Sequence, residues 1–108
     1  MRTTTYRPIL VSPKTAVLLV FMPGNAAQRL AVELQLERVG TVLGNELRIT
    51  LVDDATHPEV VNSFSINALP AFVLLKQGTE VWRQLGLLET PELIRSLSGQ
   101  LNNLQPNL

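Results

Sequence analysis

Apolar and polar positions alternate along the chain in blocks that predict strands and helices in turn. The segment Ala16–Met22 is apolar throughout, which is typical of a strand covered on both faces. After a break at Pro23-Gly24-Asn25, apolar residues recur from Ala26 to Leu43 at the spacing of a helix. They form two series: Ala27, Leu30, Ala31 and Leu34, and then Val32, Leu36, Val39 and Leu43.

The next block predicts a strand and a short helix. Leu47–Val52 is β-prone and is followed by two aspartates. Thr56 and Glu59 fit a capping box, in which the hydroxyl and the carboxylate satisfy free N–H groups at the start of a helix that runs to Phe64.

A hairpin and a final helix complete the elements that the pattern predicts. Pro70 cannot donate to a β-ladder, so it belongs at the entrance of the apolar strand Ala71–Leu75. A Gln-Gly turn then leads to a second strand, Glu80–Leu88. A helix is expected from Thr90 to about Leu101, with proline in its first turn.

The two ends of the chain are expected to lie at the margins of one domain. Thr5–Val11 is β-prone but broken by Pro8, which predicts an edge strand, and Asn102–Leu108 is expected to be a polar, frayed tail. A β-α-β unit is parallel and right-handed, and the hairpin is antiparallel. The order therefore predicts an α/β fold in residues 1–108, with a core from about 5 to 101 and a mixed sheet between helices on both faces.

Composition narrows the function. The 108 residues are 45% hydrophobic and 17% charged, which indicates a compact soluble domain. Nine basic residues balance nine acidic ones, so neither nucleic acid nor an anionic membrane is an expected partner. No segment approaches the roughly 20 apolar residues that span a bilayer.

The sequence contains no cysteine, which excludes disulfides, thiolate zinc sites, iron–sulfur clusters and thiol catalysis.

Met1–Met22 has basic residues before an apolar run and could pass for a signal peptide. The run is short, the leader holds two prolines, and residues 25–27 form a weak cleavage site. We therefore expect the run to remain as a strand of a cytoplasmic protein.

Two further patterns suggest chemistry only weakly. His57 lies near Asp53, Asp54 and Glu59, but the aspartates end a strand while the histidine and glutamate begin a helix, so no metal site is expected. A lone histidine without a nucleophile motif does not support a catalytic triad. The break at residues 23–25 precedes a helix but lacks a phosphate-binding fingerprint, and no cofactor is expected.

On the last strand, Trp82 is expected either beneath the C-terminal helix or in a subunit contact. Arg83 and Arg7 are interpreted as charges that protect sheet edges.

Particular residues resemble those of the thioredoxin family. They are the apolar strand ending in Phe21, the long helix after a loop, Leu51-Val52-Asp53, Ala68-Leu69-Pro70 before Phe72-Val73-Leu74-Leu75-Lys76-Gln77-Gly78, and Gly86. The resemblance covers roughly Ala16–Leu101. It implies a thioredoxin-like three-layer α/β/α sandwich in which Pro70 is the family's cis-proline, although the usual first helix is missing.

The same resemblance implies that the active site is lost. Aligned without gaps from Phe21, the positions of the family's two cysteines hold Ala26 and Arg29. Thiol–disulfide exchange proceeds by thiolate attack on sulfur, so this chain cannot perform it alone. The family's buried aspartate aligns with Val20 and its lysine partner with Ile49, which removes a buried ion pair that has no use without thiols.

The resemblance also implies a peptide groove that needs no thiol, because an extended segment can bind through backbone edges. Its residues here are Met22, Pro23, Asn25, Ala26, Leu69, Pro70, Leu85 and Gly86. Alternatively, the cis-proline turn persists only because the fold requires it.

Three functions remain open. The first is a redox-inactive module that binds a protein or peptide or serves as a scaffold. Such a module could form a homodimer. The second is an accessory component of cell redox homeostasis that works with a cysteine-bearing partner. The third is a chaperone-like maturation factor.

Overall fold

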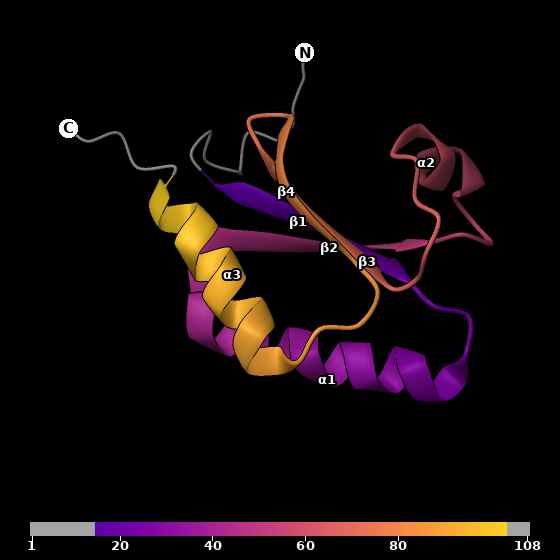
Figure 1. Ribbon diagram of the computed structural model, residues 1–108, viewed down its shortest axis with the longest axis horizontal. Helices are drawn as coiled ribbons and strands as arrows, with labels where there is room; N and C mark the ends of the chain where they lie inside the picture. Colours follow the sequence, from indigo (N-terminus) through magenta and orange to yellow (C-terminus); the bar gives the residue numbers. More distant parts are fainter. Residues whose placement is uncertain (1–14, 104–108) are drawn as a thin grey trace, which may run out of the picture.

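The computed structural model describes residues 15–103, so the strand predicted at Thr5–Val11 lies outside the described residues. A four-stranded mixed sheet in the order β2-β1-β3-β4 forms the centre of the molecule (Figure 1). The elements are β1 (Ala16–Met22), α1 (Ala26–Leu43), the 3-10 helix η2 (Gly44–Glu46), β2 (Leu47–Asp53), α2 (Pro58–Ser63), β3 (Ala71–Lys76), β4 (Thr79–Leu85) and α3 (Thr90–Asn103).

The strand pairing confirms the predicted α/β topology. β1 and β2 are parallel and are joined through α1, with Val20 opposite Leu51. β1 is antiparallel to β3, and β3 and β4 form the predicted hairpin. β1 is thus paired on both sides, as its uninterrupted apolar sequence indicates.

Helices cover both faces of the sheet. α1 and α3 lie together on one face, and α2 lies on the other (Figure 1). The larger core cluster joins the α1–α3 face to the sheet. Its fully buried side chains include Leu18, Phe72 and Leu74 of the strands and Leu93 and Leu97 of α3. Trp82 packs against this cluster on the α3 side, which agrees with the first of its two expected positions.

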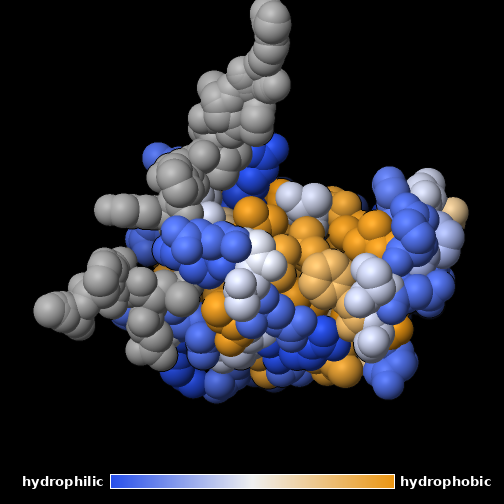
Figure 2. All heavy atoms as spheres, turned by 90° about the horizontal axis from the view of Figure 1, so that it is seen from above, coloured by the Kyte–Doolittle hydropathy of each residue, from blue (hydrophilic) through white to orange (hydrophobic). Residues whose placement is uncertain are grey.

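A smaller core cluster lies on the α2 face. Phe21, Val52, Val61 and Val73 are buried there, and the rings of Phe21 and Phe64 meet at 5.8 Å between centroids. Figure 2 views the molecule from the side opposite α1 and shows hydrophobic side chains gathered beside α2. This short helix therefore anchors the segment that leads to β3.

Only one of the two apolar series in α1 is buried. Val32, Leu36, Val39 and Leu43 face the sheet. The other series points away from it, and Leu30 and Leu34 are 57% and 56% exposed. The sequence identified both series correctly, but periodicity alone does not say which one meets the sheet.

Turns and caps explain where the elements begin and end. The Asn25 side chain caps α1 by accepting a hydrogen bond from the Gln28 N–H at 3.0 Å. Gln77 and Gly78 both have positive φ, 54° and 82°, the geometry of a tight hairpin turn that matches strand twist. β4 ends at Leu85, three residues earlier than predicted, because Gly86 (φ 86°) turns the chain toward α3.

The capping box predicted for α2 is wrong. His57 is the N-cap residue, and it makes no side-chain capping bond. The Thr56 hydroxyl instead donates to the Asp53 carbonyl at 3.4 Å and lies 3.0 Å from His57 Nδ1. Because Pro58 takes the first helical position, the helix begins one residue later than a cap at Thr56 requires.

Candidate functional site

The candidate site lies where β1 and β2 end and β3 begins. Met22 and Pro23, which close β1, are buried. Gly24, Asn25 and Ala26 then emerge as an exposed loop and the first turn of α1. The position that the resemblance gives to the first cysteine is thus an exposed alanine at the beginning of a helix.

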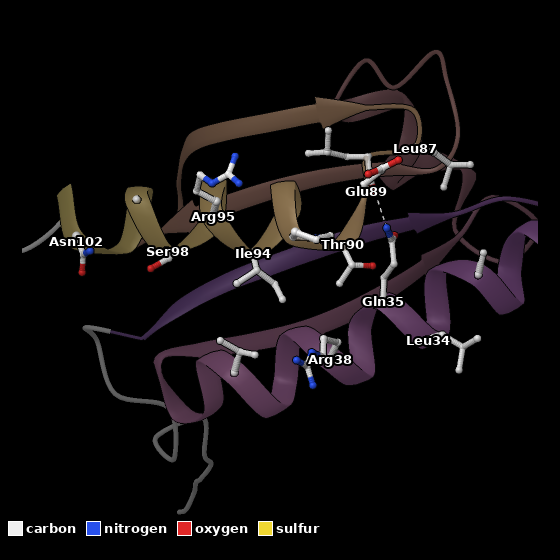
Figure 3. A pocket seen from close by; sticks show the side chains of 15 residues that line it. Leu34, Gln35, Arg38, Leu87, Glu89, Thr90, Ile94, Arg95, Ser98 and Asn102 are labelled. Carbon is white, nitrogen blue, oxygen red and sulfur yellow. Dashed lines mark hydrogen bonds between the residues drawn. The ribbon is translucent and has the colours of Figure 1, made fainter.

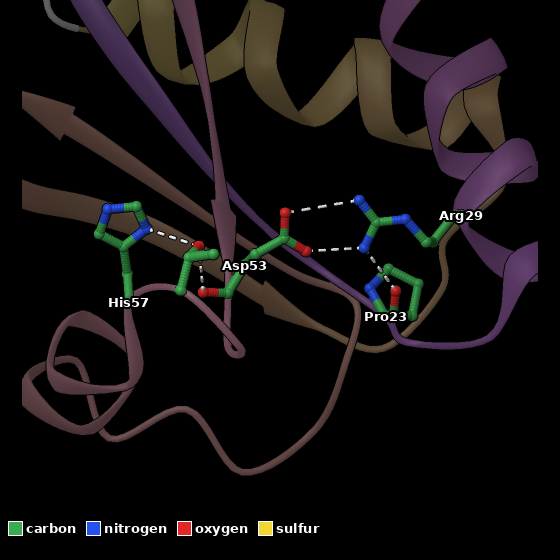
Figure 4. A network of polar contacts seen from close by, with 5 residues as sticks. Pro23, Arg29, Asp53 and His57 are labelled. Carbon is green, nitrogen blue, oxygen red and sulfur yellow. Dashed lines mark hydrogen bonds and ion pairs between the residues drawn. The ribbon is translucent and has the colours of Figure 1, made fainter.

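Arg29 ties this loop to β2. Its Nη1 donates to the Pro23 carbonyl at 3.0 Å and to Asp53 Oδ1 at 2.7 Å, and its Nη2 lies 3.5 Å from Asp53 Oδ2 (Figure 4). A planar guanidinium suits a carboxylate in this forked geometry. The residue at the second cysteine position therefore links three segments of the site without a covalent bond.

Sequence reasoning identified Arg29 only as a replaced cysteine and assigned Asp53 only a strand end. The two residues are 24 positions apart, and only their opposite charges could have suggested the pairing from the sequence. The hydrogen bond from Arg29 lowers the pKa of Asp53 below its ordinary value and raises the pKa of Arg29. Both side chains are more than 30% exposed, at 33% and 40%, so water screens their attraction and the pair acts chiefly through geometry.

A second ion pair joins the hairpin to the α2 segment. Arg83 donates to both carboxylate oxygens of Glu80, at 2.6 and 2.8 Å, and to the Phe64 carbonyl at 3.0 Å. The hydrogen bond from Arg83 lowers the pKa of Glu80. Arg83 belongs to β4, an edge strand of the sheet in residues 15–103, and it also links this strand to the α2 segment.

These two carboxylates predict an acid-labile stability. A carboxyl group whose pKa is lower in the folded chain stabilises it fully above its unfolded pKa and loses this contribution as pH falls through the folded pKa. The ordinary values are 3.8 for Asp53 and 4.5 for Glu80. We therefore expect the urea midpoint to fall below about pH 4.5, and Asp53→Asn to flatten the lower part of that decline. A variant with the same decline as the parent would contradict the role of Asp53.

Leu69 and Pro70 form the other wall of the site. Their peptide bond is cis, and the Pro70 carbonyl accepts a hydrogen bond from the Gly86 N–H at 2.7 Å. In the register of the hairpin, Ala71 lies opposite Leu85. Leu69 and Leu85 are 36% and 37% exposed, so two leucines from adjacent segments present apolar surface beside the turn.

Leu69 makes no hydrogen bond within residues 15–103, either from its N–H or to its carbonyl. The neighbouring Pro70 carbonyl is, by contrast, engaged by Gly86. An extended peptide can pair with such a free backbone edge as an added strand, and its side chains can contact the exposed leucine beside that edge.

The strand register aligns Phe21, Ala71 and Leu85, so the predicted groove residues next to them in sequence, Met22, Pro70 and Gly86, lie at one end of three neighbouring strands. Only part of the predicted groove is exposed. Asn25, Ala26, Leu69 and Leu85 are exposed. Gly86 is half-buried, and three residues are buried: Met22, Pro23 and Pro70. The buried ones shape the floor of the site and offer no surface, because Met22 belongs to the larger core and Pro23 holds Arg29.

The two positions that the resemblance assigns to the lost buried ion pair lie on neighbouring strands. Val20 is buried, and Ile49 packs against the core cluster that contains Val20. In the parallel register Ile49 lies opposite Leu18, while Leu51, which is 49% exposed, lies opposite Val20.

The histidine loop holds no metal-binding cluster. Asp53 turns toward Arg29, while His57 contacts Thr56 (Figure 4). Within residues 15–103, no group of three or more histidine, cysteine or acidic side chains is arranged to hold a metal ion. Among the helices of that same range, none combines the length and the apolar character needed to cross a membrane.

Sequence reasoning missed a groove between α1 and α3. Its volume is about 1450 Å³, and Gln35 of α1 donates to the Leu88 carbonyl at one end (Figure 3). The groove is lined by Ala31, Leu34, Gln35, Arg38, Val42, Leu87, Leu88, Glu89, Thr90, Pro91, Ile94, Arg95, Ser98, Gly99 and Asn102. The second apolar series of α1 was the only pattern in the sequence that could have indicated this groove.

Similar sequences are thioredoxins and a thioredoxin-like protein, although no family model matches the chain. The thioredoxin-like protein slr0233 of Synechocystis sp. is 34% identical over 62 residues, which cover 57% of this chain and 59% of that protein. A thioredoxin of Mycobacterium tuberculosis is 32% identical over 69 residues, 64% of this chain and 60% of that one. The match thus spans about three fifths of the length of these curated relatives.

Solved structures share the fold more widely. The structure described as thioredoxin-2, a component of malaria parasite protein secretion machinery, superposes with a TM-score of 0.73 at 20% identity and covers 79% of this chain and 82% of that one. Fasciola hepatica thioredoxin gives 0.67 at 20% identity, with 85% and 83% covered.

The mixed sheet, the helices on both faces and these superpositions define a thioredoxin-fold α/β domain. The sequence relatives are likewise thioredoxins and a thioredoxin-like protein, so the chain is similar to thioredoxins in sequence and fold but contains no cysteine.

Proposed function

We propose that this chain is a redox-inactive binding module that captures an extended segment of a protein or peptide beside Pro70. The observation that carries the proposal is Leu69, which is exposed and has no hydrogen bond within the described residues. A partner segment that adds to this edge gains backbone hydrogen bonds without any thiol.

The surroundings of Leu69 suit an apolar segment. The exposed Leu85 lies on the neighbouring strand, opposite Ala71. Ala26, at the start of α1, is exposed and has a small side chain. Successive residues of an extended peptide point to opposite sides, so alternate apolar side chains of the partner would contact Leu69 and Leu85.

The Arg29 link supports binding rather than turnover. It holds the Pro23 carbonyl and Asp53 at 3.0 and 2.7 Å and so fixes the loop between β1 and α1. A site that is formed before its ligand arrives spends less free energy on ordering when the ligand binds.

Binding to an unfolded protein tests the proposal. The probe is α-lactalbumin kept unfolded by carboxymethylation of its cysteines, which offers extended apolar segments and no reactive thiol. We expect Leu69→Asp to weaken binding by about tenfold or more, because a carboxylate enters an apolar contact. Fluorescence anisotropy of the labelled probe measures the dissociation constant.

The matched control is Leu51→Asp, since Leu51 is also an exposed leucine, at 49%, but belongs to β2. This variant should bind like the parent, and thermal unfolding of both variants monitors the fold. Equal binding by the parent and Leu69→Asp would overturn the proposal, as would a complete lack of binding by the parent.

A further inference from the structure

α1 has a second apolar face that nothing in the described chain covers. At about 100° per residue, Leu30 and Leu34 lie on the side opposite the buried series, and Val42 lies between the two, toward the groove. They are 57%, 56% and 49% exposed, and the nearby Leu87 is 53% exposed. A helix that is apolar on two opposite faces is ordinarily buried on both, so this stripe indicates an interface.

The stripe runs beside the α1–α3 groove. Leu34 and Val42 of α1 line it together with Leu87 and Ile94, and Figure 3 shows Ile94 pointing from α3 toward α1. The surface therefore combines a ridge, at Leu30 and Leu34, with an adjacent apolar hollow. A surface with both features can pack against a copy of itself.

The charges at the rim of the stripe are separated by sign. Glu33 and Glu37 lie on one side of the ridge formed by Leu30 and Leu34, and Arg38 lies on its other side, along the groove. None of the three forms an ion pair within residues 15–103. The two glutamates are four residues apart, where like charges repel each other. Glu33 interacts electrostatically with Arg29 of the same chain, so Glu37 is the carboxylate that a cation from outside would stabilise most.

From this pattern we infer that two copies of the chain associate through the α1 stripe, about a two-fold axis roughly parallel to the helix. In that arrangement opposite sides of the two stripes meet, as in a parallel coiled coil. Arg38 of each copy then faces the glutamates of the other, and the leucine ridge of each fills apolar surface on its partner. An antiparallel arrangement would place the acidic sides together.

A second copy fits this surface better than an unrelated helix. An unrelated helix would need an apolar face with a cation on one side and an anion on the other at matching heights, whereas symmetry supplies both from the same sequence. The proposal concerns a surface other than Leu69 and Ala26, so it goes beyond the proposed function and fails or succeeds independently of it.

Sedimentation velocity tests the association over protein concentrations from about 1 μM to about 1 mM. We expect the parent to shift from monomer to dimer, and Leu34→Glu to raise the dissociation constant by at least about tenfold, because a charge replaces a central apolar contact. Leu51→Glu, on β2, should dimerise like the parent. Circular dichroism verifies that each variant is folded. A parent that stays monomeric throughout, or a Leu34→Glu variant that dimerises equally well, overturns the inference.

Charge exchange tests the orientation. Arg38→Glu alone and Glu33→Arg/Glu37→Arg together should each weaken self-association, because like charges then meet. An equimolar mixture of the two variants should dimerise again, since every contact in the mixed pair is of opposite sign. Because both variants keep the apolar stripe, restoration in the mixture reports the charges alone. A mixture that dimerises no better than either variant overturns the parallel arrangement.

Discussion

Cysteines introduced together at positions 26 and 29 are expected to form a disulfide and to give the chain a measurable insulin-reducing activity. The two positions are three residues apart in the first turn of α1, where Cα atoms are separated by about 5 Å, within the range that a disulfide bridges. A thiol at the helix N-terminus also has a lowered pKa, which favours the thiolate. The parent, with no cysteine, should not exceed the dithiothreitol background.

The activity of the double variant should stay well below that of a thioredoxin, because Ala27 and Gln28 separate the cysteines and the Arg29 link to Asp53 is lost. Thiol titration before and after oxidation counts the disulfide, and insulin turbidity measures the turnover. Ala26→Ser/Arg29→Ser is the matched control and should remain inactive. Two thiols that persist under oxidation would show that the retained fold no longer positions this pair.

Phe72→Ala is expected to cost about 3–5 kcal/mol of unfolding free energy, a large share of the 5–15 kcal/mol typical of a domain. Phe72 is fully buried in the larger core cluster, and it lies opposite Val20 in the pairing of β3 with β1. Truncation removes a ring that contacts both the strands and the helix layer and leaves a cavity that the neighbours fill only partly. Urea denaturation followed by circular dichroism measures the loss.

Leu30→Ala is the control for this loss, since Leu30 is 57% exposed in α1 and alanine is a better helix former. Its stability at low concentration, where any dimer has dissociated, should stay within about 0.5 kcal/mol of the parent. A Phe72→Ala cost below about 1 kcal/mol would contradict the assignment of this ring to the core.

Most of the fold followed from the sequence because its elements differ in periodicity. The uninterrupted apolar run of β1 predicts a central strand, and the proline before β3 predicts a strand entrance; both are where the pattern places them. The start of α2 was predicted wrongly because two neighbouring residues could cap it. Thr56 is a residue type that commonly caps helices, but Pro58 occupies the first helical position, so His57 is the cap.

The site was harder to predict because its contacts are remote in sequence. The Arg29–Asp53 pair closes a separation of 24 residues, and neither residue type is unusual where it stands. The exposure of Leu30 and Leu34 likewise depends on which side of α1 meets the sheet, a property of the assembled layers. Family resemblance located the cis-proline turn, but the strand register, which places Leu51 opposite Val20 and Ile49 opposite Leu18, follows only from the assembled sheet.

The link made by Arg29 also bears on where such a module can operate. A pair of cysteines at the same place would be open or closed according to the reduction potential of its surroundings. A guanidinium that holds a carbonyl and a carboxylate involves no electron transfer and stays formed in reducing and oxidising compartments alike. The shape of this site is therefore independent of redox poise and responds instead to acidity.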